Sequence, residues 1–159
     1  MTIHAVELMR EHTPEGTRLH HTITAGGGAA NVVPEFSEGF FYVRHPKAEV
    51  VSQLWPRLRK CAEAGALATE TRLEVVPLGG TLEILPNDTL GRITAENLKA
   101  QNDLAYDAAE EAFAVRLRET FGEKAPPTES IREVANQSGK VTNGSTDVGD
   151  VSWVVPTTG

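Results

Sequence analysis

The segment that most restricts the fold is residues 26–46, GGGAANVVPEFSEGFFYVRHP. Its glycines and Pro34 favour a wide turn, because glycine adopts positive φ readily, whereas proline fixes its own φ and keeps the preceding residue extended. Residues 36–45 then alternate as in a strand, and residues 17–25, TRLHHTITA, do the same. We expect two strands joined by a wide connection in which residues 26–28 take positive φ. A phosphate loop is disfavoured, because a strand rather than a helix follows the glycines.

Helical patterns flank the two expected strands. Residues 3–10 have apolar side chains at helical spacing before Pro14 and Gly16 interrupt them. In the segment HPKAEVVSQLWPRLRKCAEAGA, Pro46 favours a helix start and Gly65 its end. Its apolar positions at three- and four-residue spacing are Val50, Leu54, Leu58 and Cys61.

The order of elements predicts an α/β (α+β) fold. Residues 71–80, TRLEVVPLGG, have the composition of a further short strand, so the order is helix, strand, strand, helix, strand. This order is typical of helices on one face of an antiparallel sheet. One strand ahead of the first helix would complete a ferredoxin-like βαββαβ unit. We expect residues 1–79 to form such a domain with its first strand missing.

Residues 80–159 have a different character and are expected to be mostly helical. After a connector, Thr94 can cap a long helix over about 95–121, and a Pro-rich break follows at 122–129. A short helical turn is expected from 130. The polar, Gly-rich tail contains VSWVV, residues 151–155, which has the composition of a buried strand.

Charge and composition exclude several classes of function. A formal net charge of −7 argues against nucleic-acid binding and against an acidic membrane face, because both require a basic surface. Cys61 is the only cysteine, so neither an internal disulfide nor a thiolate metal cluster can form. The sequence has no apolar run of bilayer length, and its N-terminus lacks the pattern of a signal peptide. We therefore expect a cytoplasmic location.

Two polar residues near the wide turn are candidates for substrate binding. Asn31 lies on a segment stiffened by Pro34, and its amide either contacts a ligand or bonds its own backbone in a turn. Arg44 ends the aromatic strand, where its planar guanidinium suits a carboxylate. A surface ion pair is the alternative role for Arg44. Residue chemistry alone leaves both alternatives open.

A second candidate site is the hydroxyl-rich loop that contains Ser145, Thr146 and Asp147. The loop lacks the acidic spacing and the closing glutamate of a calcium loop. It is either the rim of an active site or a simple turn. The histidines lack metal-ligand spacing, since His20 and His21 are adjacent and point to opposite faces of a strand.

The stretch ITAGGGAANVVPEFSEGFFYVRHP resembles the lid, or dimerisation, domain of the metal-dependent amidohydrolase and exopeptidase family that includes aminoacylases and desuccinylases. The shared pattern is a glycine-containing turn, Asn-Val-Val-Pro, a strand and a terminal arginine. VRHP and the late NGSTDVGDVSWVVPT are similar to the p-aminobenzoyl-glutamate hydrolase type within that family. The resemblance extends over nearly the whole chain.

The resemblance implies a function and a set of residues. It implies hydrolysis of an amide bond next to a carboxylate, in an N-acyl or p-aminobenzoyl amino acid or a short peptide. It assigns substrate binding to Asn31 and Arg44, and homodimerisation to the lid sheet, with a second subunit as a further partner. In such a dimer, both residues reach the substrate in the active site of the partner. The family uses a divalent metal, zinc or manganese, with a glutamate base.

The resemblance also shows what this sequence lacks. The family's HxD segment and its paired glutamates precede the lid, and its last histidine ligand follows the GSTD segment. None of them matches a position here, so we expect a fragment: an incomplete lid in residues 1–79 and part of a catalytic domain in 80–159. We assign no catalytic or metal-ligating residue to the chain and expect no metal in it alone. The alternative is a non-catalytic, ferredoxin-like oligomerisation or binding module.

Overall fold

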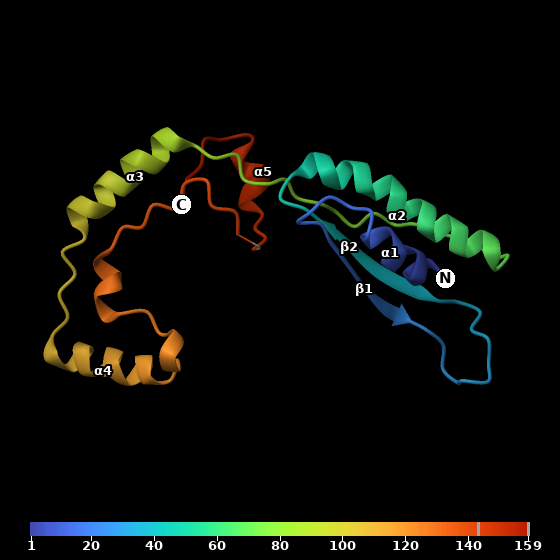
Figure 1. Ribbon diagram of the computed structural model, residues 1–159, viewed down its shortest axis with the longest axis horizontal. Coiled ribbons are helices and arrows are strands. Elements are labelled where there is room, and N and C mark those ends of the chain that lie inside the picture. Colours follow the sequence, from blue (N-terminus) through green and yellow to red (C-terminus); the bar gives the residue numbers. More distant parts are fainter. Residues whose placement is uncertain (143, 159) are drawn as a thin grey trace. The chain divides into compact units, whose positions relative to one another are not determined.

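The computed structural model describes residues 1–142 and 144–158, which divide into two compact units. The first unit consists of Met1–Ile84 and the described part of Asn143–Asp150. The second consists of Leu85–Thr142 and the described part of Val151–Gly159. Figure 1 shows the helices and strands of both.

The first unit is a two-stranded sheet with two helices packed on it. Its elements are α1 (Thr2–Arg10), β1 (Arg18–Ala25), β2 (Glu38–Arg44) and α2 (Ala48–Ala68) (Figure 1). The strands pair in antiparallel fashion, α1 contacts α2 and β1, and α2 contacts β2. The prediction of a mixed α/β fold, with helices on an antiparallel sheet, is confirmed.

The core of this unit forms where both helices meet one face of the sheet. Alternation along β1 buries Leu19, whereas its neighbours Arg18 and His20 are exposed. On β2, Val43 packs against the same core. Burial of these apolar side chains stabilises the unit by removing them from water. The buried cluster consists of Val6, Met9, Leu19 and Leu58, and Phe41, Val43 and Cys61 pack against it.

The connection between the strands is a long, exposed loop. Gly27 has a φ of +102°, and a Cβ at this position would lie 3.3 Å from the Pro34 side chain. The backbone N–H of Val32 donates to the carbonyl of Ala29 at 3.2 Å, which closes a turn. Positive φ was expected for residues 26–28, but within this run it occurs at Gly27 alone.

The long helix α2 passes through two residues that sequence patterns associate with helix ends or kinks. Pro56 lies inside α2, and the helix continues beyond it. Gly65, expected at its end, is buried within it, where a Cβ would collide with Thr2 Oγ1 of α1. The helix ends at Ala68, with Thr69 as its C-cap. The role of Gly65 is therefore the close approach of α1 to α2, which corrects the predicted helix end.

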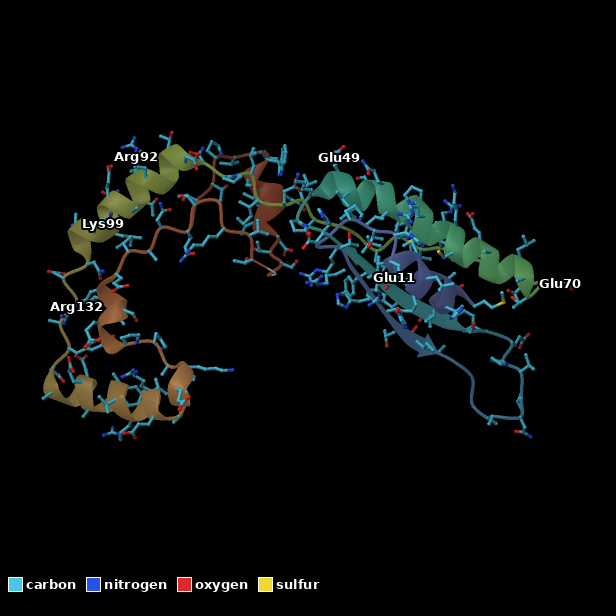
Figure 2. All side chains as sticks on the ribbon, viewed as in Figure 1. Glu11, Glu49, Glu70, Arg92, Lys99 and Arg132 are labelled. Carbon is cyan, nitrogen blue, oxygen red and sulfur yellow. The ribbon has the colours of Figure 1, made fainter. Side chains whose placement is uncertain are left out.

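Charged side chains cover the solvent-facing surfaces of the helices. Glu49 lies in the first turn of α2, where a negative charge interacts favourably with the helix dipole (Figure 2). In the second unit, Arg92 and Lys99 extend from α3 (Asp88–Gln101), and Arg92 pairs with Glu96 one turn later at 3.1 Å (Figure 2). Exposed pairs of this kind contribute little to stability.

The strand expected over residues 71–80 does not form. The described sheet has two strands, and this segment has no regular secondary structure. Leu78 is 74% exposed, and Gly79 has a φ of +157°. In a ferredoxin-like unit the last strand pairs with the first, and without that partner the segment has no ladder of hydrogen bonds to join.

The second unit contains α3, α4 (Ala108–Glu119) and two short 3₁₀ helices, η1 (Gly122–Lys124) and η2 (Thr128–Arg132). Neither α3 nor α4 has a buried residue, and Phe113 of α4 is 58% exposed. Hydrogen bonds join segments of this unit that are distant in sequence. For example, Arg132 Nε donates to the Leu104 carbonyl at 3.1 Å. The unit is helical, as expected, but it has no buried apolar core among its described residues.

The single long helix expected over about 95–121 is divided in two. The first helix, α3, begins earlier than predicted because Asn87, rather than Thr94, caps it, accepting from the Leu90 N–H at 2.9 Å. The second, α4, starts at a capping box in which Asp107 and Glu110 each bond the other's backbone N–H. This strong start signal favours a new helix over continuation of the first.

The VSWVV segment, residues 151–155, is not a strand. It includes the end of α5 (Val148–Ser152) and a following turn, in which the Val155 N–H donates to the Val151 carbonyl at 2.8 Å. Val154 is 83% exposed. Local hydrogen bonds of this kind satisfy the backbone without a neighbouring strand.

Within residues 1–142 and 144–158, no helix combines the length and the apolar character that a membrane span requires.

Replacing a buried leucine of α2 should destabilise the chain much more than replacing an exposed one. Leu54 is 2% exposed and Leu67 is 82% exposed. We expect Leu54→Ala to lower the free energy of unfolding by about 2–4 kcal/mol, because it leaves a cavity. Leu67→Ala should change it by less than about 0.5 kcal/mol. Urea denaturation followed by circular dichroism measures both, and equal effects would contradict the packing described.

Candidate functional site

Arg44 is the last residue of β2, and the histidine that follows it fixes this end of the strand. His45 Nδ1 accepts the backbone N–H of Lys47 at 3.0 Å. Because Nδ1 is an acceptor, Nε2 holds the proton and donates to the carbonyl oxygen of Glu15 at 3.1 Å. We call this arrangement of His45, Glu15 and Lys47 the His45 clasp. It ties the loop before β1 to the start of α2.

The clasp is supported by a close backbone contact. Gly16 has a φ of +84°, a conformation that favours glycine. A Cβ on Gly16 would lie 3.7 Å from Pro46 Cδ and 3.8 Å from His45 Nε2. The loop before β1 therefore lies directly against residues 45 and 46, so Arg44 projects from a well-supported strand end.

A carboxylate from a distant segment caps α2 beside this strand end. Lys47 is the N-cap of α2 but makes no side-chain capping bond. Glu83 Oε2 instead accepts the backbone N–H of Ala48 at 2.9 Å. This bond satisfies a free N–H of the first turn and places a negative charge at the positive end of the helix dipole.

The loop that contains Ser145, Thr146 and Asp147 lies next to the segment that supplies Glu83. Asp150 Oδ1, in the same loop region, accepts the backbone N–H of Leu82 at 2.7 Å. Gly149 lies so close to the Leu82 carbonyl that a Cβ there would collide with it.

Within the loop itself, Thr146 Oγ1 accepts the Val148 N–H at 3.3 Å. Because Leu82 adjoins Glu83, this series of contacts leads from the loop to the first residue of α2, close to Arg44.

Asn31, in contrast, lies at the other end of the hairpin. It occupies the exposed loop between the strands, whereas Arg44 ends β2. β2 is seven residues long, which corresponds to about 20 Å. The structure thus links the loop of Ser145, Thr146 and Asp147 to the start of α2, which follows Arg44 in the chain, whereas Asn31 lies at the far end of the hairpin.

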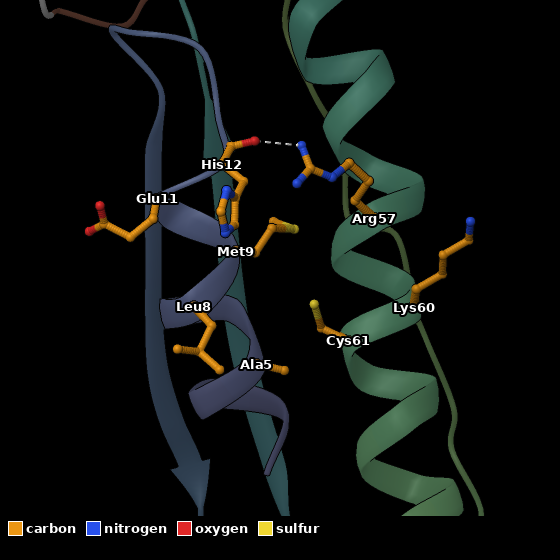
Figure 3. Close-up of a pocket in the computed structure, with 8 residues that line it drawn as sticks. All are labelled: Ala5, Leu8, Met9, Glu11, His12, Arg57, Lys60 and Cys61. Atoms are coloured by element: carbon orange, nitrogen blue, oxygen red, sulfur yellow. Dashed lines mark hydrogen bonds between the residues drawn. The ribbon is translucent and has the colours of Figure 1, made fainter.

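A shallow depression lies on the first unit between α1 and α2 (Figure 3). Leu8, Met9 and Cys61 are apolar residues of its lining. At its rim, Arg57 Nη1 donates to the His12 carbonyl at 2.9 Å, which joins the end of α1 to α2 (Figure 3). None of the residues proposed from the sequence lines it.

The described residues do not fit a metal site. Among them, no three or more His, Cys, Asp or Glu side chains converge as metal ligands would. Two carboxylates in the region of Arg44 already accept backbone N–H groups, since Glu83 caps α2 and Asp150 bonds Leu82. The described residues therefore offer binding and positioning groups.

No role was assigned from the sequence to His45 or Glu83, although both shape the site. They differ in whether a local sequence pattern indicates their role. His45 has a local signal, because it stands between the strand-ending Arg44 and Pro46. Glu83 has none, because its partner Ala48 is 35 residues away in sequence. A cap supplied from so far along the chain depends on the tertiary fold.

Removing the His45 imidazole should loosen this end of the hairpin. We expect His45→Ala to lower the free energy of unfolding by about 1–2 kcal/mol, because two hydrogen bonds are lost. Amide exchange at Lys47 should become faster. His20→Ala is the control, since His20 is exposed on β1. Slow Lys47 exchange in the His45 variant would contradict the clasp.

Three curated relatives are similar to this chain over almost all of its length. It is 29% identical to a subunit of p-aminobenzoyl-glutamate hydrolase from Escherichia coli K12 over 93% of the chain. It is 28% and 29% identical to the Xaa-Arg dipeptidases of Mus musculus and Homo sapiens, each over 95% of the chain. No protein-family model matches.

The chain spans about a third of the length of these relatives: 36% of the first and 29% of each dipeptidase. This coverage is consistent with the fragment expected from the sequence. All three relatives are hydrolases by name, and the resemblance identified in the sequence is confirmed. The chain is therefore similar to amidohydrolases and peptidases over nearly all of its length.

Proposed function

We propose that this chain supplies the carboxylate-binding part of a metal-dependent amidohydrolase, which cleaves an amide bond next to a carboxylate. The observation on which the proposal depends is Arg44 at a strand end supported by the His45 clasp. A planar guanidinium on a rigid strand can bind a carboxylate through two hydrogen bonds at little ordering cost. The substrate class is an N-acyl or p-aminobenzoyl amino acid, or a short peptide.

The names of the relatives support this class of substrate. One is a hydrolase of p-aminobenzoyl-glutamate and the others are dipeptidases for Xaa-Arg. Both kinds of substrate contain an amide bond with a carboxylate on its amino-acid side. The substrates named for the relatives therefore share the carboxylate that a guanidinium such as that of Arg44 can bind.

Asn31 and Arg44 have different places in this proposal. They are separated by the length of β2, about 20 Å, which exceeds the length of an N-acyl amino acid. We therefore assign them to different active sites of a homodimer, Arg44 to one and Asn31 to the other. This arrangement modifies the sequence-based expectation that both reach the substrate in the partner's site.

The hydroxyl-rich loop is proposed to complete the site at Arg44. Ser145, Thr146 and Asp147 are exposed, and the hydrogen bond from Leu82 to Asp150 holds the region near the start of α2. Hydroxyl groups there can donate to a second substrate oxygen. A zinc or manganese ion in the parent would be bound by residues other than those that the structure describes.

Further features of the parent are proposed as well. The Escherichia coli relative is named as a subunit, so a second subunit is included in addition to the homodimer. The cytoplasmic location remains a prediction. The alternative function, a non-catalytic oligomerisation or binding module, is favoured by a two-stranded sheet whose outer edges have no described partner strand. The genomic sequence that flanks the coding region of this chain decides between the enzyme and the non-catalytic module, because the enzyme requires segments with metal ligands there.

The carboxylate role of Arg44 can be tested in a parent protein that contains the chain. We expect Arg44→Lys to lower kcat/KM for an N-acyl amino acid by about tenfold or more, because an ammonium cannot reproduce the bidentate geometry. Arg59→Lys is the matched control, since Arg59 is exposed on α2 and pairs with Glu63. Equal kcat/KM values for the Arg44 variant and the wild type would refute the role.

Dimerisation through the sheet can be tested on the chain itself. Ile23 of β1 is 60% exposed, and a lysine there should oppose pairing of the strand edge with a second copy. We expect sedimentation velocity to give a dimer for the wild type and a monomer for Ile23→Lys. Leu67→Lys, at an exposed position of α2, should remain dimeric. A wild-type monomer at high concentration would contradict the proposal.

A further inference from the structure

We propose that Arg18 is a second carboxylate-binding residue, which binds the same substrate carboxylate as Arg44. This inference rests on the proposed function and names a residue that neither the sequence nor the relatives' names indicate. Together the two guanidinium groups, which we call the arginine pair, would form one anion-binding site at the end of the hairpin.

The strand register brings the two arginines together. Arg18 is the first residue of β1 and Arg44 the last of β2, and they are direct partners across the antiparallel ladder. Directly opposed residues have Cβ atoms about 4.5–5.5 Å apart and project to the same face of the sheet. Both guanidinium groups can therefore reach one ligand a few ångströms across.

The arginine pair lies on the face of the sheet opposite the core. The next pair in the register, Leu19 with Val43, packs into the core beneath α1 and α2. Because side chains alternate along strands, Arg18 and Arg44 project away from the helices. Both are exposed, so this face is accessible to a small molecule.

Two positively charged side chains at opposed positions of the ladder favour an anionic ligand over a neutral one. Arg18 donates to the adjacent Thr17 carbonyl at 3.3 Å, a long bond that an anion can replace.

The backbone at the arginine pair is held from both sides. Gly16, two residues before Arg18, lies against Pro46, and His45 directly follows Arg44 and bonds the Glu15 carbonyl. The His45 clasp thus joins the chain segments that precede Arg18 and follow Arg44. Preorganisation of this kind lowers the ordering cost of binding.

The chemistry of the arginine pair favours a carboxylate shared by two guanidinium groups. Each carboxylate oxygen has two acceptor positions, and each guanidinium offers several donors in one plane. A neutral amide in place of the carboxylate offers one acceptor oxygen and no charge. The pair should therefore distinguish an N-acyl amino acid from its amide.

The test uses the full 159-residue chain, with N-acetylglycine as the probe and N-acetylglycinamide as its neutral match. Titrations followed by ¹H–¹⁵N NMR report on the arginine Nε–Hε groups. We expect N-acetylglycine to shift the signals of both Arg18 and Arg44, whereas the amide shifts neither. Arg18→Gln and Arg44→Gln should each weaken binding of N-acetylglycine by about fivefold, as expected for exposed charged pairs.

The controls separate this inference from the proposed function. Arg59→Gln should bind N-acetylglycine as the wild type does, and circular dichroism verifies that each variant is folded. The double variant with Arg18→Gln and Arg44→Gln should lose less affinity than the product of the two single losses, because both arginines bind one ligand.

The outcomes for the single variants distinguish the two proposals. If Arg44→Gln weakens binding but Arg18→Gln does not, the arginine pair is wrong and the proposed function stands. If neither weakens it, both are wrong. Equal binding of inorganic phosphate would overturn the preference for a carboxylate.

Discussion

The antiparallel register between β1 and β2 is the constraint on which the rest of the first unit depends. Leu19 opposite Val43 supplies the sheet side of the core. A slip of one residue would turn this pair toward solvent and bring arginines under α1 and α2. Hydrophobic packing and the position of the charged side chains are therefore set by the same pairing, and neither can change without the other.

The two ends of the hairpin differ in how firmly they are held. At the Arg44 end, the His45 clasp, the Glu83 cap and the close contact at Gly16 join segments far apart in sequence. At the other end, a turn hydrogen bond from Val32 to Ala29 closes the loop around Asn31, and the residues of this loop are exposed. The firmly held end suits groups that must be positioned, and the open loop suits a contact that adjusts to a partner.

Local patterns in the sequence were sufficient to predict the hairpin and its two covering helices, because alternation and helical spacing are read within each segment. The strand at 71–80 was predicted wrongly because a strand also needs a partner, which local composition does not reveal. The break between α3 and α4 had a visible signal, the Asp107 and Glu110 capping box, which the search for one long apolar stripe overlooked. Arg44 and Asn31 could be proposed as site residues from their type and place in the sequence, whereas the capping role of Glu83 required the fold.

The single cysteine gives the α1–α2 contact an intrinsic reporter. Cys61 is half-buried on α2 and packs against the core that includes Met9 of α1. The thiol also lines the depression between α1 and α2, so a change in the packing of these helices changes its exposure. Its rate of alkylation would therefore report on this contact in solution, without a label being introduced and without perturbing the hairpin end at Arg44.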